Sequence, residues 1–515
     1  MFAIRRFMQL TAVVAAAVMM VSCATEAKKP TFADEGNMIP DNAVIAMKVN
    51  AQQLIDKVAG DPDSKLYEYL QEYKGQMPFD AASLGINLDV PVVISCSADI
   101  QDVKRGDASF EAYAVALLDD SNAFVKSIDE VTAMFKLMGV SVVKEAVDNN
   151  TYYKSSFEKG MYVDVAVSPK AVVIRYTYNE SAVEAGLKDS MFKLFANGGP
   201  QQSEGLDEFY LTKCDLAMWL DAGVLVDMVM PLLDAYEPKS AAQLKSYMPM
   251  YEGWSTVAEL NFEDGKTALT FKTFGSEQMN LYATKYNAVP NGKLLKHVPA
   301  TAAFVGNIAI KDFPGLVDEL CSMSDEYAYM FEYLSEEYGV NEELLAGMPG
   351  TITVAVDGTY IDTLEYPGFM VSVECDRNVW EFAKQYLAEE AEKLDEDAYC
   401  VEDKFYVFYD EGFVNLVDSN MAMVVIIGND ISFADTKLGA DIQNGGFAFN
   451  LAALPAHVVE SVAQEIDLNM TAEDILEYVS SVTVTTSQDF MSATITVNME
   501  DTEHNLLEKV VSLVL

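Results

Sequence analysis

The chain repeats its own sequence, and this repetition constrains the fold more than any other feature. The segment Ile39–Ile45 recurs as Val298–Phe304, and later segments recur in the same order. The further matches are Leu54 and Val58 with Phe313 and Val317, Glu68–Leu70 with Glu332–Leu334, Val93–Ser95 with Ile352–Val354, Asp120–Phe124 with Asp376–Trp380, Tyr152–Tyr153 with Phe405–Tyr406, Ala217–Ala222 with Ala448–Ala453, and Val257 and Ala268 with Val482 and Ala493. An unbroken order of this length predicts a duplication, so that one fold has to satisfy both halves.

The boundaries of the repeat follow from local composition. Val289–Lys293 reads Val-Pro-Asn-Gly-Lys, which is turn chemistry. We therefore predict an α+β repeat 1 over 38–290 and an α+β repeat 2 over 294–515. Each repeat is much longer than the roughly 20–50 residues of a solenoid unit, so a solenoid is excluded.

Within one repeat, short β-branched runs separated by turns outnumber helical stretches. Val90–Ser97, Tyr113–Leu118, Met161–Val167 and Ala171–Tyr178 are strand-like. Helical spacing appears in separate blocks, as at Leu54, Ile55 and Val58. Strands joined by short turns, with helices in blocks, favour α+β repeats, each a mainly antiparallel sheet with helices packed on it.

Two recurring patterns on predicted helices have a structural and a functional interpretation. Asp120 and Asp376 follow predicted strands and are placed to cap helices; metal ligation is the alternative, but an EF-hand loop would need further ligands that are missing here. Aromatic and aliphatic residues also form a helical stripe in each repeat, which predicts core contact, with a ligand groove as the alternative. The stripes are Leu66, Tyr69, Leu70 and Tyr73 in repeat 1, and Tyr327, Met330, Phe331, Leu334 and Tyr338 in repeat 2.

The first residues indicate export and lipid attachment. Arg5 and Arg6 precede an apolar run, Leu10–Val21, that has the length of a signal-peptide h-region and is too short to span a bilayer. Ser22 and Cys23 complete a loose bacterial lipobox. We expect residues 1–22 to be a lipoprotein signal peptide. The alternative is an ordinary secretory signal in which the cysteine is accidental.

Lipidation at Cys23 would place the protein on a membrane. Acyl chains contribute roughly 0.8 kcal/mol per buried CH₂, so two or three chains anchor a protein stably. Residues 23–37 are small and polar without periodicity, which predicts a flexible tether. We expect a location in the cell envelope, at the outer membrane, while the sequence leaves the periplasmic and surface faces open. No later run is long and apolar enough for a transmembrane helix.

The charge of the chain excludes one class of partner. The 34 Lys and Arg residues stand against 80 Asp and Glu residues, a formal net charge of −46. Such a field repels DNA and RNA, so we expect no nucleic-acid partner. A solvated acidic surface explains this charge without a partner; a basic or cation-rich partner is the sharper alternative.

Residues for familiar catalytic or metal chemistry are sparse. The three histidines, His297, His457 and His504, are far apart in the sequence, which gives a zinc site or a Ser-His-Asp triad little to build on. The chain has none of the G-x-S-x-G, H-E-x-x-H, Walker or G-x-G-x-x-G motifs. We therefore predict no catalytic, cofactor-binding or metal-binding residue, and no cofactor. The remaining cysteines, for which we expect mostly free buried thiols with one bridge possible, are Cys96, Cys214, Cys321, Cys375 and Cys400.

One acidic cluster has two interpretations. Its members are Glu389, Glu390, Glu392, Asp395, Glu396 and Asp397. The cluster predicts the solvated side and the end of a helix, with weak calcium binding as the alternative.

The lipobox and the opening of the body together resemble a known family. Ile39-Pro40-Asp41-Asn42-Ala43, repeated in part at Val298-Pro299, is similar to the start of Bacteroidota envelope lipoproteins that form a domain-of-unknown-function family. The resemblance implies an envelope lipoprotein with an internally duplicated body and transfers no catalytic residue.

Three functions are compatible with the sequence. The first is a non-enzymatic, lipid-anchored binding or structural protein with an envelope protein or glycan as partner. The second is a carboxylate-based hydrolase acting on glycan or peptidoglycan, which predicts two buried acids with raised pKa in one cleft. The third is a carbohydrate binder, for which Trp219, Trp254 and Trp380 would be exposed, although strand and helix cores are their expected positions.

Overall fold

The computed structural model divides the chain into two compact units. Unit 1 comprises Met1–Phe262, Phe271–Ser276 and Leu507–Leu515, and unit 2 comprises Glu263–Thr270 and Glu277–Leu506. Unit 2 thus begins ahead of the turn at Val289–Lys293. The structure describes residues 39–40, 43–59, 84–102, 107–137, 139–158, 161–179, 191, 203–242, 245, 253–275, 280–281, 284–323, 325–348, 350–358, 367–422, 432–465 and 470–514.

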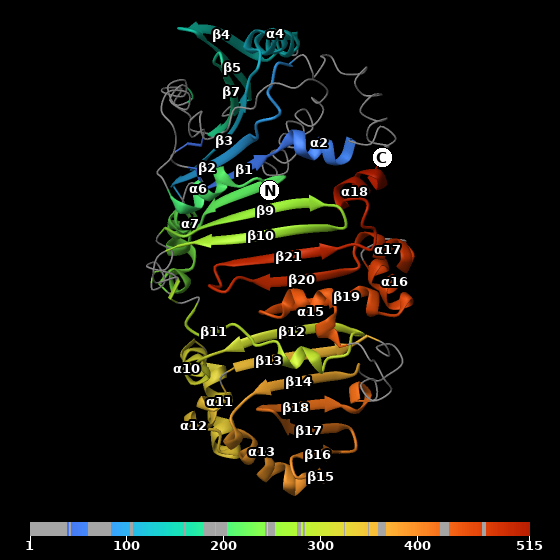
Figure 1. Cartoon of the computed structure of the whole chain (residues 1–515). Helices are drawn as coiled ribbons and strands as arrows, with labels where there is room; N and C mark the ends of the chain where they lie inside the picture. Colours follow the sequence, from blue (N-terminus) through green and yellow to red (C-terminus); the bar gives the residue numbers. More distant parts are fainter. Residues whose placement is uncertain are drawn as a thin grey trace. The chain divides into compact units, whose positions relative to one another are not determined.

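Unit 1 contains an antiparallel sheet (Figure 1). Its strands are β1 (Ile45–Val49), β2 (Val92–Asp102), β3 (Asp107–Leu117), β4 (Ser141–Val147), β5 (Asn150–Glu158), β6 (Met161–Val167), β7 (Ala171–Asn179), β8 (Leu216–Asp221) and β9 (Ser255–Glu263), and β10 (Lys266–Phe274) follows in the chain. Hydrogen-bonded neighbours follow the order β9, β8, β1, β2, β3, β7, β6, β5, β4, and all of these pairs are antiparallel.

Unit 2 also contains an antiparallel sheet. Its strands are β11 (Asn287–Ala288), β12 (Ala302–Ile310), β13 (Gly350–Asp357), β14 (Phe369–Glu374), β15 (Glu392–Asp395), β16 (Ala398–Val401), β17 (Phe405–Asp410), β18 (Phe413–Asp418), β19 (Gly446–Asn450), β20 (Ser481–Thr486) and β21 (Ser492–Asn498). The order is β21, β20, β19, β12, β13, β14, β18, β17, β16, β15, again antiparallel throughout, and short β11 pairs with β12. The α+β class with a mainly antiparallel sheet is confirmed.

The strand order of unit 1 from β9 to β4 corresponds one to one with that of unit 2 from β20 to β15. The pairing registers correct four of the sequence matches. We compared the two sheets strand by strand, starting from Lys48 in unit 1 and Asn307 in unit 2. In this comparison Val93 falls on Thr353 and Val257 on Thr483, each one residue from its predicted partner. Tyr153 on β5 corresponds to Tyr399 of β16, not to Tyr406 of β17. Trp219 likewise falls on Ala448, a shift of two residues that keeps each side chain on the same face of its sheet.

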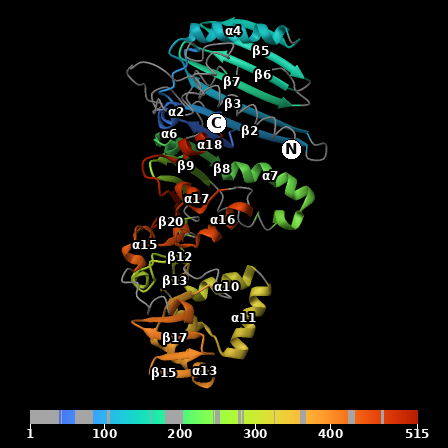
Figure 2. The same ribbon diagram turned by 90° about the vertical axis from the view of Figure 1, so that its right-hand side faces the viewer.

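The helices of unit 1 include the two that the sequence predicts, around Leu54–Val58 and after Asp120. They are α2 (Ala51–Ala59), α4 (Ser121–Leu137), α6 (Glu204–Leu211), α7 (Ala222–Tyr236) and α18 (Leu506–Val514). Asp120 caps α4 as expected, because its carboxylate accepts the backbone N–H groups of Asn122 and Ala123 at 2.9 and 3.1 Å. In both views α4 lies beside β5 (Figures 1 and 2). The Tyr153 hydroxyl on β5 donates to Asp129 on α4 at 2.9 Å, which ties the helix to the sheet.

The helices of unit 2 occupy comparable places in the chain. They are η3 (Lys293–Lys296), α10 (Phe313–Met323), α11 (Asp325–Tyr338), α12 (Glu342–Ala346), α13 (Arg377–Glu390), η4 (Phe433–Asp435), α15 (Lys437–Ile442), η5 (Leu451–Ala453), α16 (Ala456–Glu465) and α17 (Ala472–Tyr478), where η denotes a 3₁₀-helix. Asp376 occupies the N-cap position of α13, but its side chain makes no capping hydrogen bond. Both aspartates therefore occupy the predicted N-cap positions, but of the two only Asp120 makes the capping hydrogen bonds.

The aromatic stripe of repeat 2 is not a core stripe. On α11, Tyr327, Met330 and Tyr338 are 48%, 53% and 42% exposed, and Phe331 and Leu334 are only partly buried. The spacing correctly indicated a helix, but α11 packs mainly against α10 and its tyrosines face solvent. The prediction of core contact is therefore wrong for this helix. The corresponding stripe at Leu66–Tyr73 lies outside the described residues.

Trp219 and Trp380 are buried, as expected for strand and helix cores, while Trp254 is partly buried. Trp380 on α13 packs 6.1 Å from Tyr399 and 6.0 Å from Tyr409, between ring centroids. It anchors α13 on the sheet of unit 2. Neither Trp219 nor Trp380 is therefore presented for carbohydrate stacking.

Candidate ligand-binding site

A cavity of about 650 Å³ opens on one face of the sheet in unit 2. Its floor consists of alternate residues on β14, β18 and β17, because alternate side chains of a strand point to the same face. The registers place Met370 beside Val417 and Val417 beside Tyr406, and Asn415 beside Phe408 one rung further along. Phe413 and Asp410 form the last rung of the floor, next to the β17–β18 turn.

The wall above this floor is the segment around η3. Gly292 precedes it with φ of 63°, a left-handed conformation, and a Cβ there would lie 3.1 Å from the Gln443 carbonyl oxygen. The Asn291 side chain accepts the Lys293 N–H at 3.0 Å, so the turn chemistry predicted at Val289–Lys293 is confirmed. Buried Leu294 and Leu295 then fasten η3.

The same segment is joined to the chain beyond β18 through backbone contacts. The Val298 carbonyl accepts the Phe433 N–H at 2.8 Å, and Pro299 forms an isolated β-bridge with Ser432. Val298 packs in one hydrophobic cluster with Met370 and Val417. The wall is therefore fixed by backbone hydrogen bonds and by apolar burial, so that the cavity is a preformed feature of the fold.

Several polar groups that line the cavity have no partner within the described part of the chain. Lys293 and Lys296 are exposed at its edge and pair with no described acidic side chain. The Ser432 Oγ is buried and has no hydrogen-bond partner there. The Tyr406 hydroxyl likewise makes no hydrogen bond to a described residue. Each of these groups can donate a hydrogen bond to a bound molecule.

The Asn415 side chain is the exception, because the protein already uses it. Its amide oxygen accepts the Ser372 hydroxyl at 2.6 Å, and its amide nitrogen donates to the Phe413 carbonyl at 3.3 Å. Asn415 is thus held in one orientation in the floor. Asn415 therefore shapes the floor of the cavity, and its amide is already engaged in hydrogen bonds within the protein.

Two carboxylates also line the cavity, at the end formed by the β17–β18 turn. Asp410 ends β17 and Glu411 follows it with φ of 47°. Asp410 lies four residues along the strand from Tyr406, a separation of about 13 Å for extended chain. The acidic groups therefore lie at the far end of the floor from the rung of Tyr406 and Val417.

The same place on the sheet of unit 1 is filled. In the corresponding rung, Tyr113 on β3 pairs with Arg175 on β7, and Arg175 pairs with Asp164 on β6. Arg175 and Asp164 are both buried, and Arg175 Nη2 also bonds to Glu111. Where unit 2 has Met370, Val417 and Tyr406 around open space, unit 1 has a buried network of charges.

Asp164 tests the hydrolase interpretation. Burial raises the pKa of Asp164 to about 6, although the charge of Arg175 opposes the shift. A hydrolase of the predicted kind needs two such acids in one cleft. Asp164 lies opposite Arg175 of β7 on one side and opposite Lys154 of β5 on the other, so its cross-strand neighbours are basic side chains.

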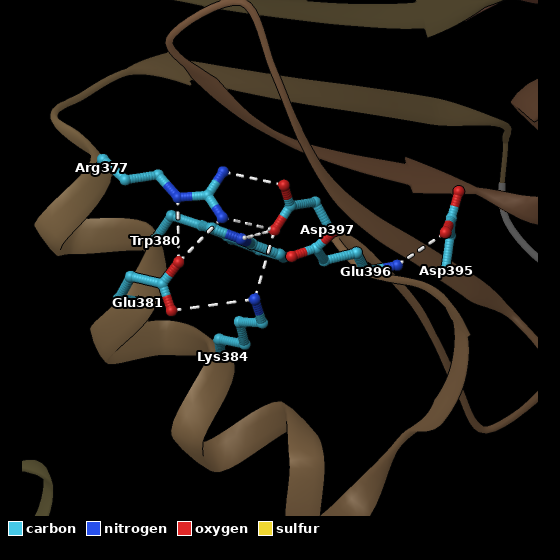
Figure 3. Close-up of polar contacts among 7 residues, drawn as sticks. All are labelled: Arg377, Trp380, Glu381, Lys384, Asp395, Glu396 and Asp397. Atoms are coloured by element: carbon cyan, nitrogen blue, oxygen red, sulfur yellow. Dashed lines mark hydrogen bonds and ion pairs between the residues drawn. The ribbon is translucent and has the colours of Figure 1, made fainter.

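The acidic cluster near the end of α13 follows the prediction in part, because Glu389 is exposed in the last turn of α13 and Glu390 ends the helix. Glu392 and Asp395 belong to β15, not to a helix end, and both are exposed. Asp397 turns inward instead, and Arg377 and Trp380 of α13 converge on it (Figure 3). Arg377 donates to both carboxylate oxygens at 2.8 Å and Trp380 Nε1 donates at 2.8 Å. These bonds hold the pKa of Asp397 well below its usual range and tie α13 to the β15–β16 turn.

The other predicted site residues fall into two groups. Cys23, residues 1–22 and the tether 23–37 lie outside the described residues. The five other cysteines carry free thiols. Groups of three or more His, Cys, Asp or Glu side chains suited to a metal do not occur in the described ranges, and no described helix is long and apolar enough to cross a membrane.

Sequence reasoning treated Val289–Lys293 as a junction and missed the cavity beside it. One local signal was available: Lys293, Lys296 and His297 are three basic side chains within five residues of a strongly acidic chain. No protein-family model matches the chain, and neither a curated protein nor a solved structure matches it.

Proposed function

We propose that this chain is a lipid-anchored, non-enzymatic binding protein of the cell envelope, with its ligand site in the cavity of unit 2. The observation that carries the proposal is the cavity itself. Its walls are apolar and aromatic, its backbone is fixed, and donors on Lys293, Lys296, Tyr406 and Ser432 are free to meet a ligand. Pockets of this size with a few polar groups are the usual sites for small molecules.

The anchor and the location belong to the same proposal. Lipid on Cys23, followed by the tether 23–37, would hold the units at the outer membrane, in keeping with the resemblance of Ile39–Ala43 to Bacteroidota envelope lipoproteins of unknown function. The net charge of −46 argues against nucleic acid as the ligand. In this proposal the exposed surfaces take an envelope protein or glycan as the macromolecular partner.

We also propose that the two units are homologous and arose by duplication. The one-to-one strand order and the recurring sequence segments support this origin. No observation on the described residues favours the hydrolase alternative.

The ligand site is tested with N-phenyl-1-naphthylamine, a neutral probe that fluoresces in apolar surroundings. Val417→Phe or Ala422→Met should fill the cavity and weaken binding of the probe on the order of tenfold. Val414→Phe is the matched control, because Val414 lies on the same strand but on the opposite face. Circular dichroism establishes that each variant is folded. Equal probe binding by wild type and both filled variants would overturn the proposed site.

The anchor is tested by cell fractionation. Cys23→Ala should move the protein from the membrane pellet to the soluble fraction, whereas the matched control Cys321→Ala should stay in the pellet. Retention of the Cys23→Ala protein on carbonate-washed membranes would contradict lipid anchoring.

A further inference from the structure

We infer that the cavity of unit 2 takes an amphiphile with an apolar body and a single anionic group, such as a carboxylate or a phosphate, and that each chain binds one such molecule. This inference rests on the proposed function and specifies its ligand. It follows from what lines the cavity, from the polar groups left without partners, and from the contrast with unit 1.

The apolar body follows from the floor and the wall. Met370, Val417 and Phe408 present hydrocarbon from three neighbouring strands, and Leu294 and Val298 close over them. Burying apolar surface contributes roughly 25 cal/mol per Å², so a ligand gains most of its affinity from this surface. A purely polar ligand would leave that contribution unused.

The anionic group follows from the donors. Lys293, Lys296 and Ser432 all offer N–H or O–H groups, and none of these is spent on a described residue. Acidic residues outnumber basic ones more than twofold in this chain, so a lysine without an acidic partner is the less expected case. The cavity carboxylates Asp410 and Glu411 belong to the turn at the far end of the floor. Asn291, two residues before Lys293, donates to Glu374 at 3.0 Å, and Glu374 pairs with Phe413 beside Asp410, so η3 begins near the acidic end of the floor. The segment then runs to Val298, which packs with Met370 and Val417. An acid group near Tyr406 and Ser432 would avoid Asp410 and Glu411, with Lys296 nearer to it along the segment than Lys293.

The stoichiometry follows from unit 1. The corresponding rung there contains Tyr113, Arg175 and Asp164. Arg175 and Asp164 are both buried and are cross-strand neighbours, and Arg175 bonds to Glu111. Opening a site at that rung would leave a buried charge without its partner, which is strongly unfavourable. Unit 2 alone therefore offers this position of the sheet to a ligand.

The experiment measures displacement of N-phenyl-1-naphthylamine by ligands that differ only in charge. Decanoate, 1-decanol and decyltrimethylammonium share one chain, and 2-naphthoate with 2-naphthalenemethanol tests a flat body in place of an acyl chain. The overall field of the protein favours the cation. We expect the reverse: decanoate binds tighter than decanol, decanol binds tighter than the cation, and native mass spectrometry finds one decanoate per chain. The tighter of the two carboxylates indicates an acyl or an aromatic source.

Paired variants assign the preference to named side chains. Lys293→Ala with Lys296→Ala should weaken decanoate on the order of tenfold, the scale of two exposed ion pairs, and leave decanol unchanged. Lys311→Ala with Lys393→Ala is the matched control, because it removes the same charge from exposed sites of unit 2 outside the cavity. This control should leave both affinities unchanged.

The alternative outcomes separate the inference from the proposed function. Decanol binding as tightly as decanoate, or an anion preference that survives Lys293→Ala with Lys296→Ala, would overturn the inference while the cavity stayed a binding site. A stoichiometry of two would overturn the contrast with unit 1. Failure of the proposed site itself would give a different result: the affinity for the probe would be the same in Val417→Phe and Ala422→Met as in the wild type.

Discussion

Asn307 on β12 holds the register position that Lys48 holds on β1, and each donates its side-chain N–H groups to carbonyls at the end of a helix. Lys48 Nζ donates to the Phe209 carbonyl at the end of α6 and to the Thr212 carbonyl beyond it, at 2.7 Å for Thr212. Asn307 Nδ2 donates to the Ile442 carbonyl at the end of α15 at 3.1 Å. Both side chains are buried. The carbonyls at a helix end lack intrahelical partners, so a buried donor in the sheet satisfies them.

Lys48→Met should destabilise the protein by about 2–4 kcal/mol. The loss of the ammonium leaves the Phe209 and Thr212 carbonyls without a donor, at about 1–3 kcal/mol for each buried group, and the saved desolvation of the charge offsets part of this cost. Urea unfolding at pH 7.5 measures the change. A variant as stable as wild type would show that these hydrogen bonds are energetically neutral.

The Lys48 ammonium should also make stability rise at alkaline pH. Burial lowers the pKa of Lys48 from 10.5 to about 8. Between these values the unfolded chain holds more protons than the folded one, so the free energy of unfolding increases with pH. Subtracting the urea-derived profile of Lys48→Met from that of wild type between pH 7.5 and 10 isolates this contribution; parallel profiles would contradict it.

Asp164 should make stability fall as pH rises through the acidic range. Its pKa is about 6 in the folded state against 3.8 for an ordinary aspartate. The folded protein therefore binds the extra proton between these values, and unfolding becomes easier as pH rises from about 4 to about 6. Two pH units correspond to about 3 kcal/mol. Asp164→Asn should remove this slope, whereas the exposed control Asp148→Asn should keep it.

Asp397→Asn should loosen α13. Arg377 lowers the pKa of Asp397, so the carboxylate is charged at every pH above about 4. Its stabilising effect is lost only as pH falls below that value. The variant should show a lower Tm and faster hydrogen–deuterium exchange in the α13 amides at pH 7. Asp395→Asn is the control, since the Asp395 carboxylate accepts only the N–H of its neighbour Glu396 among described groups. Equal exchange in both variants would argue against Asp397 as the anchor.

The thiols should react in order of burial. Burial raises the pKa of Cys96 to about 11, so at pH 8 almost none of it is thiolate. Cys321 on α10 is half-buried, while Cys214, Cys375 and Cys400 are buried. We expect Ellman's reagent to label Cys321 first in the native protein, and Cys321→Ala to abolish this fast phase. Fast labelling of that variant would show that another thiol is accessible.

Local signals in the sequence predicted local structure well. Asp120 after a β-branched run indicated a helix start, and the structure confirms its capping bonds. The strand-like runs Met161–Val167 and Ala171–Tyr178 are β6 and β7, and in the turn between them the Ser168 Oγ accepts the Ala171 N–H at 2.9 Å. Such features depend on side chains within a few residues of each other, which is the range over which sequence patterns carry information.

Features that depend on distant segments were missed or misplaced. Helical spacing on α11 could not reveal that no sheet would cover Tyr327 and Met330. Residue matching placed Tyr152–Tyr153 on β17, because Phe405–Tyr406 there is an adjacent aromatic pair, whereas β16 has the single aromatic Tyr399. The cavity was missed for the same reason, since Met370, Val417 and Tyr406 meet only through the pairing of three strands.

The floor of the cavity consists of side chains, while the strands below them are held by an unbroken ladder of backbone bonds. A substitution at Val417 or Tyr406 therefore changes which ligand fits the cavity without changing the conformation of the backbone. Unit 1 shows the opposite use of the same position, where Arg175 and Asp164 close it. A protein built in this way can vary its selectivity by point substitution in one half while the other half keeps the scaffold constant.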